Sequence, residues 1–345
     1  MPELRIGTWW LVGFLVFFGA GCEGDERVTE GDSDADVDAD TDIDGAGDAD
    51  RDGDADGDVE AGTDADIDVE TLPDGDPGDA DEDEPLPRVD YGVPGPYTVT
   101  TEDGQYGASC RTPYRVFTPT DAPAGPLVVL SHGFQRRQAN VADVARHYAT
   151  WGLRAATMNL CHAGITDNQP ERDAADLRGL ADLLGAEAVL YVGHSAGGLR
   201  VVLAARDDPG TVAVLGLDLV DRGEMALEAA RTLTVPLHGI LGEPGSCNER
   251  GNGAPVYEAA AEGNAVRVTE AEHCDFEAPT DGLCTALCAV RNTAFTEEQI
   301  RATVLGLSTS FLIWQSGLDP RGMGWWTPGT PAYDEMIAGG AVTQL

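Results

Sequence analysis

Residues 188–198 read Ala-Val-Leu-Tyr-Val-Gly-His-Ser-Ala-Gly-Gly, and this stretch is the strongest indication of the fold in the chain. The first five are apolar and partly β-branched, which is typical of a buried strand in a parallel sheet. Residues 199–205 are apolar and suit a helix. Between these segments lies Gly-x-Ser-x-Gly, the pattern of a serine on a sharp strand-to-helix turn where larger side chains would clash. We therefore predict that Ser195 projects from the end of a strand, beside the positive end of a helix.

Strand-like and helix-like segments alternate on both sides of this turn. The sequence predicts an antiparallel strand at 111–118 and buried strands at 127–131, 153–158, 188–192, 212–217, 237–241 and 265–269. It predicts helices at 141–151, 174–184, 199–205, 224–231 and 296–314. This alternation indicates an α/β fold, with a mostly parallel central sheet and helices on both faces. In such sheets, ligands bind at the carboxyl ends of the strands.

The chain of 345 residues divides into three parts, of which 91–345 is long enough for one large catalytic domain. Residues 1–22 hold an apolar run behind Arg5 that ends in Gly-Ala-Gly-Cys. This pattern resembles a bacterial signal peptide that ends in a lipobox. Lipidation of Cys22 would anchor the protein to a membrane of the cell envelope or surface. Cleavage without lipidation, which gives a secreted protein, is the alternative.

The middle part, residues 23–90, is an Asp-rich linker. Residues 23–84 carry 29 acidic side chains and two arginines, a charge of −27 out of the formal −40 of the chain. With few large apolar side chains, this segment is expected to stay disordered and to space the folded domain from the membrane. The stretches 40–45 and 48–53 imitate calcium loops, but Arg51 and Val59 stand where the loop needs a glutamate, so no specific calcium site is expected. The negative charge also argues against a nucleic-acid partner.

Six cysteines follow Cys22, namely Cys110, Cys161, Cys247, Cys274, Cys284 and Cys288. An even number in an exported chain predicts disulfides, although the sequence does not choose among the pairings; free buried thiols are the alternative. Cys247 and Cys274 follow neighbouring predicted strands, so a bond between them would brace the loop that carries His273. The chain has no Cys-x-x-Cys pair, so no zinc ribbon is expected. We predict neither a metal nor a cofactor.

A serine hydroxyl becomes a useful nucleophile only when a base accepts its proton. His273 follows the last of the predicted strands and is the candidate base. His238 lies inside a strand and is expected to be packed, and His147 lies on a helix. His162 follows another strand, but it precedes Ser195 in the chain.

The base needs a carboxylate to orient it and to stabilise the imidazolium. Asp218 directly follows the strand at 212–217, and Glu243 follows the strand at 237–241. Both give the chain order Ser, acid, His, and the sequence leaves the two acids open. Asp221 is a weaker third candidate.

The negative oxygen that forms during acyl transfer needs backbone N–H donors. The amide of Ala196, directly after the serine, is the first candidate donor. The loop Ser-His-Gly-Phe at 131–134 follows an earlier strand, and the amide of Phe134 is the second. His132 in this loop is expected to support the backbone rather than to transfer a proton.

Four stretches resemble the α/β-hydrolase superfamily, most closely its chlorophyllase, cutinase-like and polyester-hydrolase group. They are His-Gly-Phe at 132–134, residues 144–153, the Gly-His-Ser-Ala-Gly-Gly turn at 193–198 and Leu-Asp-Leu-Val-Asp at 217–221. The resemblance spans Leu127 to Phe276. Chlorophyllase-like members carry the acid at the position of Asp218, although Leu219 stands where they have Pro, and cutinase-like members carry it near Glu243; the resemblance favours Asp218. Ala196 stands where plant chlorophyllases have Arg, which argues against chlorophyll as a substrate.

The motifs and the resemblance together imply an exported serine hydrolase that cleaves carboxylic esters through an acyl-enzyme. Its substrate would be a small-molecule, lipid or polymer ester. The same fold supports many reactions, so a peptidase or another acyl hydrolase is an alternative. A surface lipoprotein that binds a ligand without catalysis is a second alternative, from a different class.

Overall fold

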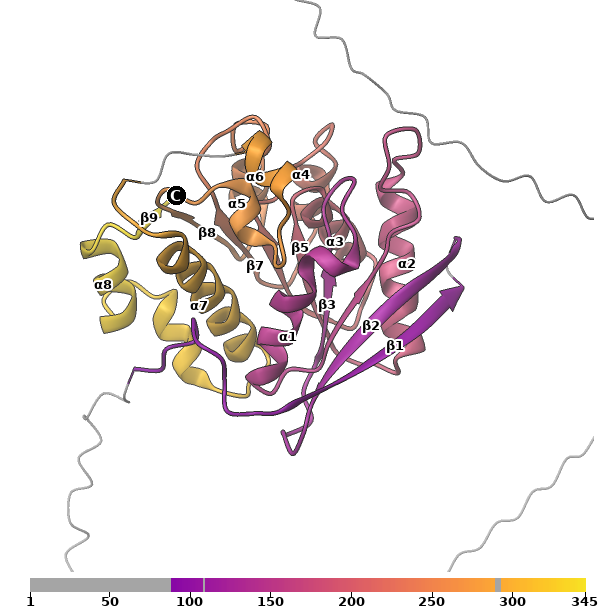
Figure 1. Cartoon of the computed structure of the whole chain (residues 1–345), viewed down its shortest axis with the longest axis horizontal. Helices are drawn as coiled ribbons and strands as arrows, with labels where there is room; N and C mark the ends of the chain where they lie inside the picture. The colour runs from indigo at the N-terminus through magenta and orange to yellow at the C-terminus, as the bar shows by residue number, and fades with distance from the viewer. Residues whose placement is uncertain (1–87, 108, 289–292) are drawn as a thin grey trace, which may run out of the picture. The chain divides into compact units, whose positions relative to one another are not determined.

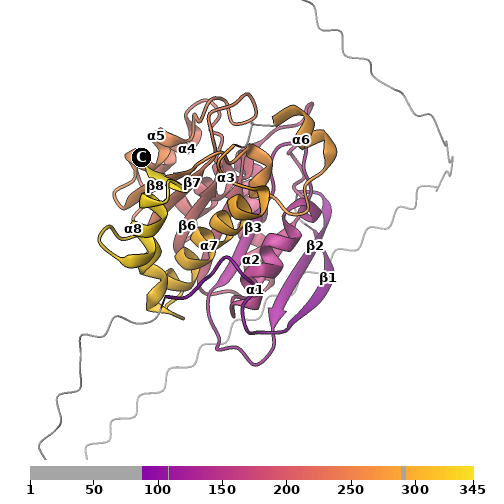
Figure 2. The ribbon, with the colours of Figure 1, turned by 60° about the vertical axis from the view of Figure 1, so that its left-hand side comes forward.

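The computed structural model describes residues 88–107, 109–288 and 293–345. The signal-like segment, Cys22, the calcium-like stretches and the Asp-rich linker up to residue 87 lie outside the described residues. The described part is an α/β structure with a nine-stranded, mostly parallel sheet and helices on both faces (Figures 1 and 2). This confirms the predicted fold class.

The strands are β1 Val99–Gly107, β2 Arg111–Pro119, β3 Leu127–Ser131, β4 Ala155–Met158, β5 Val189–His194, β6 Thr211–Leu217, β7 Leu237–Leu241, β8 Gly263–Val268 and β9 Val342–Gln344. They are ordered β1-β2-β4-β3-β5-β6-β7-β8-β9 across the sheet. All pairs from β4 to β8 are parallel, whereas β1, β2 and β9 pair antiparallel at the two edges. The sequence analysis missed β1, because most of its side chains are polar and exposed and show no apolar alternation. It also missed β9, which is only three residues long.

The α-helices are α1 Ala142–Thr150, α2 Pro170–Leu183, α3 Ala196–Arg206, α4 Met225–Ala230, α5 Ala254–Ala259, α6 Gly282–Cys288, α7 Glu297–Gln315 and α8 Pro331–Ala338. The 3-10 helices are η1 Gln138–Val141, η2 His273–Phe276 and η3 Pro320–Trp325. The sequence analysis missed α5, α6 and α8, each of which has eight residues or fewer. Such short segments hold too few turns to show a helical period.

Alternating side chains of each central strand build two separate cores, one on each face of the sheet. On β5, Leu190 and Val192 pack into one core, and Val189 and Tyr191 pack into the other. Helices α1 and α7 cover the first core and lie in front of the sheet in Figure 1, while α2, α3, α4 and α5 cover the second. Burial on both faces explains why these strands are continuous apolar runs.

The parallel strands bring the candidate residues to one edge of the sheet. Ser131 at the end of β3 pairs with Gly193 near the end of β5, and His194 pairs with Leu217 at the end of β6. Ser195, Asp218 and the loop that carries His273 follow β5, β6 and β8, so they all leave the carboxyl edge. This is the edge where an α/β sheet binds its ligands.

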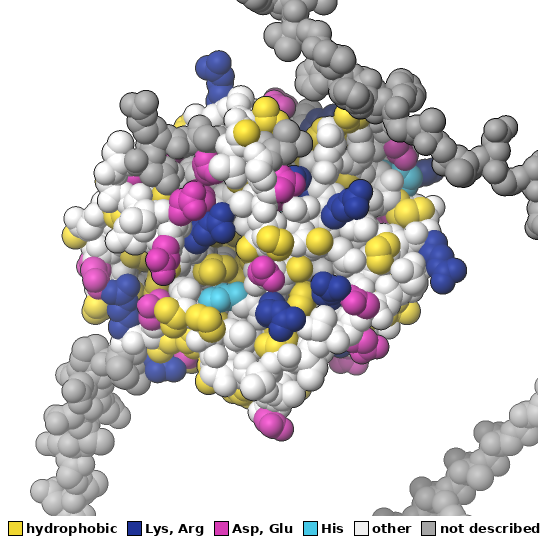
Figure 3. Space-filling view, viewed as in Figure 1, with side chains coloured by type: hydrophobic (Ala, Val, Ile, Leu, Met, Phe, Trp, Pro, Cys, Tyr) yellow, Lys and Arg dark blue, Asp and Glu magenta, His cyan; other side chains and the backbone are white. Residues whose placement is uncertain are grey.

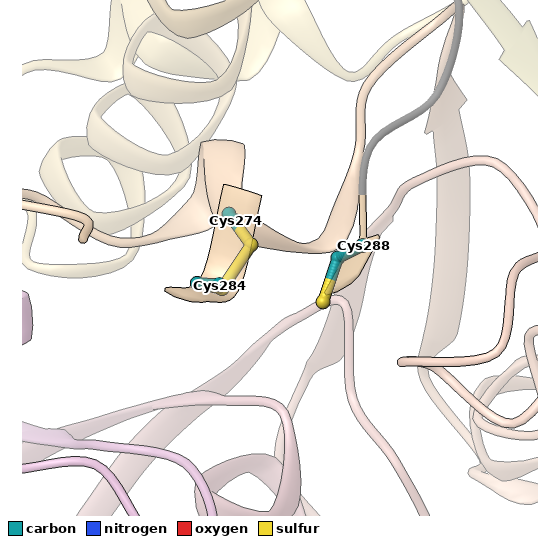
Figure 4. A group of neighbouring side chains, drawn as sticks. All are labelled: Cys274, Cys284 and Cys288. Atoms are coloured by element: carbon teal, nitrogen blue, oxygen red, sulfur yellow. A yellow bond between two sulfur atoms is a disulfide. The ribbon is translucent and has the colours of Figure 1, made fainter. Parts of the chain in front are cut away.

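The cysteines form Cys110–Cys161, Cys247–Cys288 and Cys274–Cys284 among the described residues. The presence of disulfides is confirmed, but the suggested bond between Cys247 and Cys274 is wrong. Helix α6, which the sequence analysis missed, supplies the actual partner of each. Figure 4 shows Cys274 bonded to Cys284, with Cys288 beside them. Cys274 is thus linked to α6 in the same segment of the chain, and Cys288 links that helix to the loop that follows β7.

Removing the Cys110–Cys161 disulfide is expected to destabilise the fold by about 4 kcal/mol, because the open loop regains its conformational freedom in the unfolded chain. This bond closes a loop of 51 residues, whereas Cys274–Cys284 closes one of 10. The same entropy argument gives about 3 kcal/mol for the shorter loop. Urea unfolding of the two paired Cys→Ser variants measures both losses. A larger loss from the Cys274–Cys284 pair than from the Cys110–Cys161 pair would contradict this expectation.

Over residues 88–107, 109–288 and 293–345, no helix combines the length and the apolar character that a membrane span requires. The face in Figure 3 mixes basic and acidic side chains with hydrophobic ones and does not gather the basic side chains into one patch.

Candidate active site

Ser195 occupies a strained turn between β5 and α3. Its backbone has φ 57° and ψ −131°, a conformation that non-glycine residues rarely adopt. The turn is tight on both sides of the serine. A Cβ on Gly193 would lie 2.3 Å from the carbonyl oxygen of Gly197, and a Cβ on Gly197 would lie 2.5 Å from the carbonyl oxygen of His132. Both positions therefore exclude larger side chains, as the Gly-x-Ser-x-Gly pattern predicts.

His273 and Asp218 form a buried pair. Nδ1 of His273, in η2, donates to Oδ2 of Asp218 at 2.5 Å. Asp218 is fully buried and His273 is 9% exposed. With Nδ1 held by the carboxylate, Nε2 is the ring nitrogen left for a substrate or a nucleophile. This is the tautomer that a general base in a serine hydrolase needs.

Two further donors hold the Asp218 carboxylate. The amide of Gly242 donates to Oδ1 at 3.0 Å, and Nδ2 of Asn248 lies 3.2 and 3.1 Å from the two carboxylate oxygens. Asn248 is itself fixed, because its Oδ1 accepts from the amides of Gly245 and Gly251. Sequence reasoning missed Asn248. Nothing in its local sequence marks it, since it meets Asp218 only in the folded chain.

The other two candidate acids have different partners. Oε1 of Glu243 accepts from the amide of Glu270 at 3.0 Å. The carboxylate of Asp221 accepts from three backbone amides around the start of α4, those of Arg222, Ala226 and Leu227. Negative charge near a helix start is favourable, so Asp221 serves the helix. Of the three candidates, Asp218 is the one whose carboxylate contacts His273.

His194 links the serine turn to His273, the candidate base. Its Nε2 donates to the carbonyl oxygen of His273 at 2.9 Å, and the two imidazole rings have centroids 4.7 Å apart. Because Ser195 is the next residue, this contact places the serine and His273 in one neighbourhood. The Ser195 hydroxyl makes no hydrogen bond to any group among the described residues. Ser195 is 8% exposed.

The loop after β3 lies directly against the serine. A Cβ placed on Gly133 would be 2.9 Å from Cβ of Ser195 and 3.3 Å from its Oγ. Phe134 follows, 37% exposed, and its amide finds no acceptor among the residues that the structure describes. Ala196 is the first residue of α3, where backbone N–H groups have no partner within the helix. The two amides proposed as oxyanion donors thus come from the two segments that border Ser195.

His132 supports this loop. Its Nε2 accepts from the amide of Leu160 at 3.1 Å, so Nδ1 carries the hydrogen and donates to the carbonyl oxygen of Gly133 at 2.8 Å. Burial lowers the pKa of His132 to about 4, which keeps the ring neutral. Both nitrogens are occupied, in agreement with the supporting role predicted for it.

A second Ser-His-Asp arrangement lies elsewhere, next to the Cys110–Cys161 disulfide. Nε2 of His162 is 2.9 Å from Oγ of Ser109, and its Nδ1 is 2.6 Å from Oδ2 of Asp167. The Ser109 hydroxyl, however, donates to a carboxylate oxygen of Asp176 at 2.5 Å. A hydroxyl whose hydrogen is already held by a carboxylate has no proton to give to His162. We interpret this group as a structural clamp between the disulfide and α2.

Two other features do not bear on the candidate site. A cavity of about 570 Å³ lies beside η3 and α8, and residues such as Val89, Met323 and Trp325 line it, with none from the site. The sulfurs of Cys274, Cys284 and Cys288 lie within 4.8 Å of one another (Figure 4). Each of them belongs to a disulfide, and metal ions bind thiolates.

Acid is expected to weaken the fold, because buried neutral histidines must become charged. Burial lowers the pKa of His132 and of His238 to about 4. The unfolded chain binds these protons below about pH 6.5, so stability falls from about pH 6.5 to about 4 and then levels. At pH 5 each histidine costs roughly 2 kcal/mol. Burial raises the pKa of Asp275 to about 6, which offsets part of this loss because the native state takes up that proton first.

Urea unfolding at pH 7.5 and pH 5 measures the effect. His238 stacks among Phe311 and Trp326, with ring centroids 4.5 and 4.7 Å away, so phenylalanine is a matched replacement for it. A His238→Phe variant should lose roughly 2 kcal/mol less than the parent between the two pH values. An equal loss in both proteins would show that His238 does not contribute.

No family model matches the chain, and no curated protein matches it either. Family membership therefore is not shown by similarity. What the fold shows is a mostly parallel sheet with helices on both faces, compatible with the α/β-hydrolase fold.

Proposed function

We propose that the protein is a serine hydrolase of the α/β-hydrolase type that cleaves carboxylic esters through an acyl-enzyme. One observation carries the proposal. Nδ1 of His273 lies 2.5 Å from Oδ2 of Asp218, beside a serine held at φ 57° between a strand and a helix. A strained, positive-φ serine is costly, and such strain is concentrated at functional sites.

In the proposed reaction, Oγ of Ser195 attacks the ester carbonyl carbon while its proton passes to Nε2 of His273. Asp218 stabilises the imidazolium that forms. The amides of Phe134 and Ala196 donate to the carbonyl oxygen as it becomes negative. The intermediate collapses, the C–O bond to the alcohol breaks, and His273 returns the proton to the leaving oxygen.

The second half repeats these steps with water. His273 takes a proton from a water molecule, whose oxygen attacks the acyl carbon. The bond to Oγ then breaks, the proton returns to Ser195, and the carboxylic acid leaves. The free Ser195 hydroxyl must approach Nε2 of His273 when substrate binds. Catalytic hydrogen bonds often tighten only in the substrate complex.

A fluorophosphonate probe tests the proposal, because it reacts covalently with an activated serine. Full-length protein should be labelled, and peptide mapping should place the label on Ser195. A panel of matched p-nitrophenyl esters and anilides then separates an esterase from a peptidase. If the folded protein does not react, the alternative of a non-catalytic binding lipoprotein is favoured.

We also propose that the protein is exported. Three disulfides among the described residues favour an oxidising compartment. Anchoring through a lipid on Cys22 stays a prediction, since Cys22 lies outside the described residues. Mass spectrometry of the mature N-terminus would distinguish a lipidated Cys22 from a free cysteine or an uncleaved signal.

A further inference from the structure

A buried ion pair joins the two loops that carry the proposed oxyanion donor and the base. Glu277 is 1% exposed, and its carboxylate accepts from Nε of Arg136 at 2.8 Å and also from Nη2. Thr280 donates a further hydrogen bond to Oε1 at 2.8 Å. Nη1 of Arg136 extends to Asp281 at 2.9 Å. A carboxylate buried this deeply is stable only when it is fully paired, and the two-point contact fixes its geometry.

The two ends of the pair lie close to the proposed machinery. Arg136 is two residues after Phe134, and its amide donates to the carbonyl oxygen of Gly133, which closes a tight turn. Glu277 directly follows η2, the 3-10 helix that begins with His273. Arg136 and Glu277 therefore span the gap between the loop after β3 and the loop after β8.

Neighbouring contacts cross the same gap. The amide of Asp143, in α1, donates to the carbonyl oxygen of Ala278 at 2.9 Å. Nδ2 of Asn140, in η1, donates to the carbonyl oxygen of Pro279 at 3.4 Å. One of these hydrogen bonds comes from a backbone amide and the other from a side-chain amide. Arg136 also lies near Ser195: a Cβ placed on Gly133 would be 3.5 Å from Cγ of Arg136 and 3.3 Å from Oγ of Ser195.

His194 explains why the carboxylate needs an arginine. Burial keeps the pKa of His194 well below its usual value, so the ring is neutral. Its hydrogen is on Nε2, which donates to His273, so Nδ1 presents a lone pair. Oε2 of Glu277 lies 3.9 Å from this nitrogen. Without Arg136, the carboxylate would repel the ring that links Ser195 to His273.

We infer that Arg136 and Glu277 are positioning residues, which fix the proposed oxyanion donor of Phe134 relative to His273. They touch no reacting atom in this scheme. Their contribution is greatest in the transition state, when the oxyanion and the imidazolium must both be stabilised at set positions. The inference rests on the proposed function, because it assigns these residues to the same reaction.

The test compares full-length Glu277→Gln with the parent on p-nitrophenyl acetate. A donor misplaced by about 1 Å costs on the order of 100-fold in rate, so kcat should fall by about 10- to 100-fold with KM within about threefold. The affinity for a trifluoromethyl ketone, which forms an oxyanion on the enzyme, should fall with kcat. A purely structural role would not separate kcat from KM in this way. An unchanged kcat in folded Glu277→Gln protein overturns the inference.

Glu277→Gln removes the buried negative charge and leaves the partly buried Arg136 with Asp281 as its ion-pair partner, so a second variant removes both charges of the pair. Arg136→Met combined with Glu277→Met leaves no buried charge without a partner, and such replacements are often well tolerated. This double variant should fold and show the same loss of kcat; wild-type kcat would contradict the inference. Asp103→Asn, which breaks the exposed Asp103–Arg115 pair of the β1–β2 hairpin, is the control and should leave kcat unchanged.

A different result is expected if the protein is not a serine hydrolase at all. In that case the parent protein itself would show no esterase activity and no fluorophosphonate label. If the parent is active and labelled on Ser195 while both Glu277 variants match its kcat, only the positioning role is refuted.

Discussion

A Ser195→Ala variant of the full chain is expected to hydrolyse p-nitrophenyl acetate about 10⁶-fold more slowly than the parent. Alanine has no oxygen to form the acyl-enzyme, so the two-step route is closed. The proposed oxyanion donors, Phe134 and Ala196, are unchanged in this variant, so a residual rate above that in water is expected. Because the Ser195 hydroxyl makes no hydrogen bond among the described residues, its removal leaves no partner unsatisfied. Stability should therefore change little, which thermal unfolding checks.

The second Ser-His-Asp arrangement supplies the control. Ser109→Ala removes a hydroxyl that lies 2.9 Å from a histidine ring, in a geometry that superficially matches a catalytic pair. It should leave kcat within about twofold of the parent, and fluorophosphonate labelling should persist. If Ser109→Ala abolished activity while Ser195→Ala retained it, the roles assigned to the two serines would be reversed.

Asp218→Asn is expected to lower kcat by about 10⁴-fold, which corresponds to about 5 kcal/mol of transition-state stabilisation. The NH₂ group of the substituted side chain cannot accept a hydrogen bond from Nδ1 of His273. If the amide oxygen turns toward the ring instead, the NH₂ group faces the donors Gly242 and Asn248. The first arrangement removes the acceptor that fixes the tautomer of His273, and the second places two donors against each other beside the ring. Steady-state kinetics of the parent and the variant under identical conditions measure the loss.

Glu243→Gln is the matched control for this variant. Among the described residues, the Glu243 carboxylate accepts one hydrogen bond, from the backbone amide of Glu270, and a glutamine oxygen accepts the same bond. This variant should retain kcat within about twofold. Asp218→Asn with more than a tenth of parental activity, or Glu243→Gln with a loss of several hundred-fold, would give the role of the acid to Glu243.

The sequence was most informative where chemistry and backbone geometry coincide in a short stretch. The turn at Ser195 needs glycines on both sides, an apolar strand before it and a helix after it, and all of these lie within residues 188–205. The buried strands were recognisable for a similar reason, because burial on both faces demands continuous apolar runs. Strand β1 was not recognisable, since an exposed edge hairpin leaves its side chains free to be polar.

Contacts between distant loops were beyond sequence reasoning. The two acids Asp218 and Glu243 both follow strands and both precede His273, so order alone does not separate them. The two acids differ in contacts that exist only in the folded chain. Gly242 and Asn248 bind the carboxylate of Asp218 directly after β6. The disulfide partners of Cys247 and Cys274 were missed because α6 is too short to leave a period. Arg136 and Glu277 are 141 residues apart, and no local pattern signals that they meet.

The turn at Ser195 and the loop after β3 are so closely packed that we expect them to move together. A methyl group on Gly197 would strike the carbonyl oxygens of Ser131 and His132, at 2.6 and 2.5 Å, and the two strands beneath are hydrogen-bonded neighbours. Hydrogen–deuterium exchange should therefore find the paired backbone amides of β3 and β5 beside the site exchanging slowly and at similar rates.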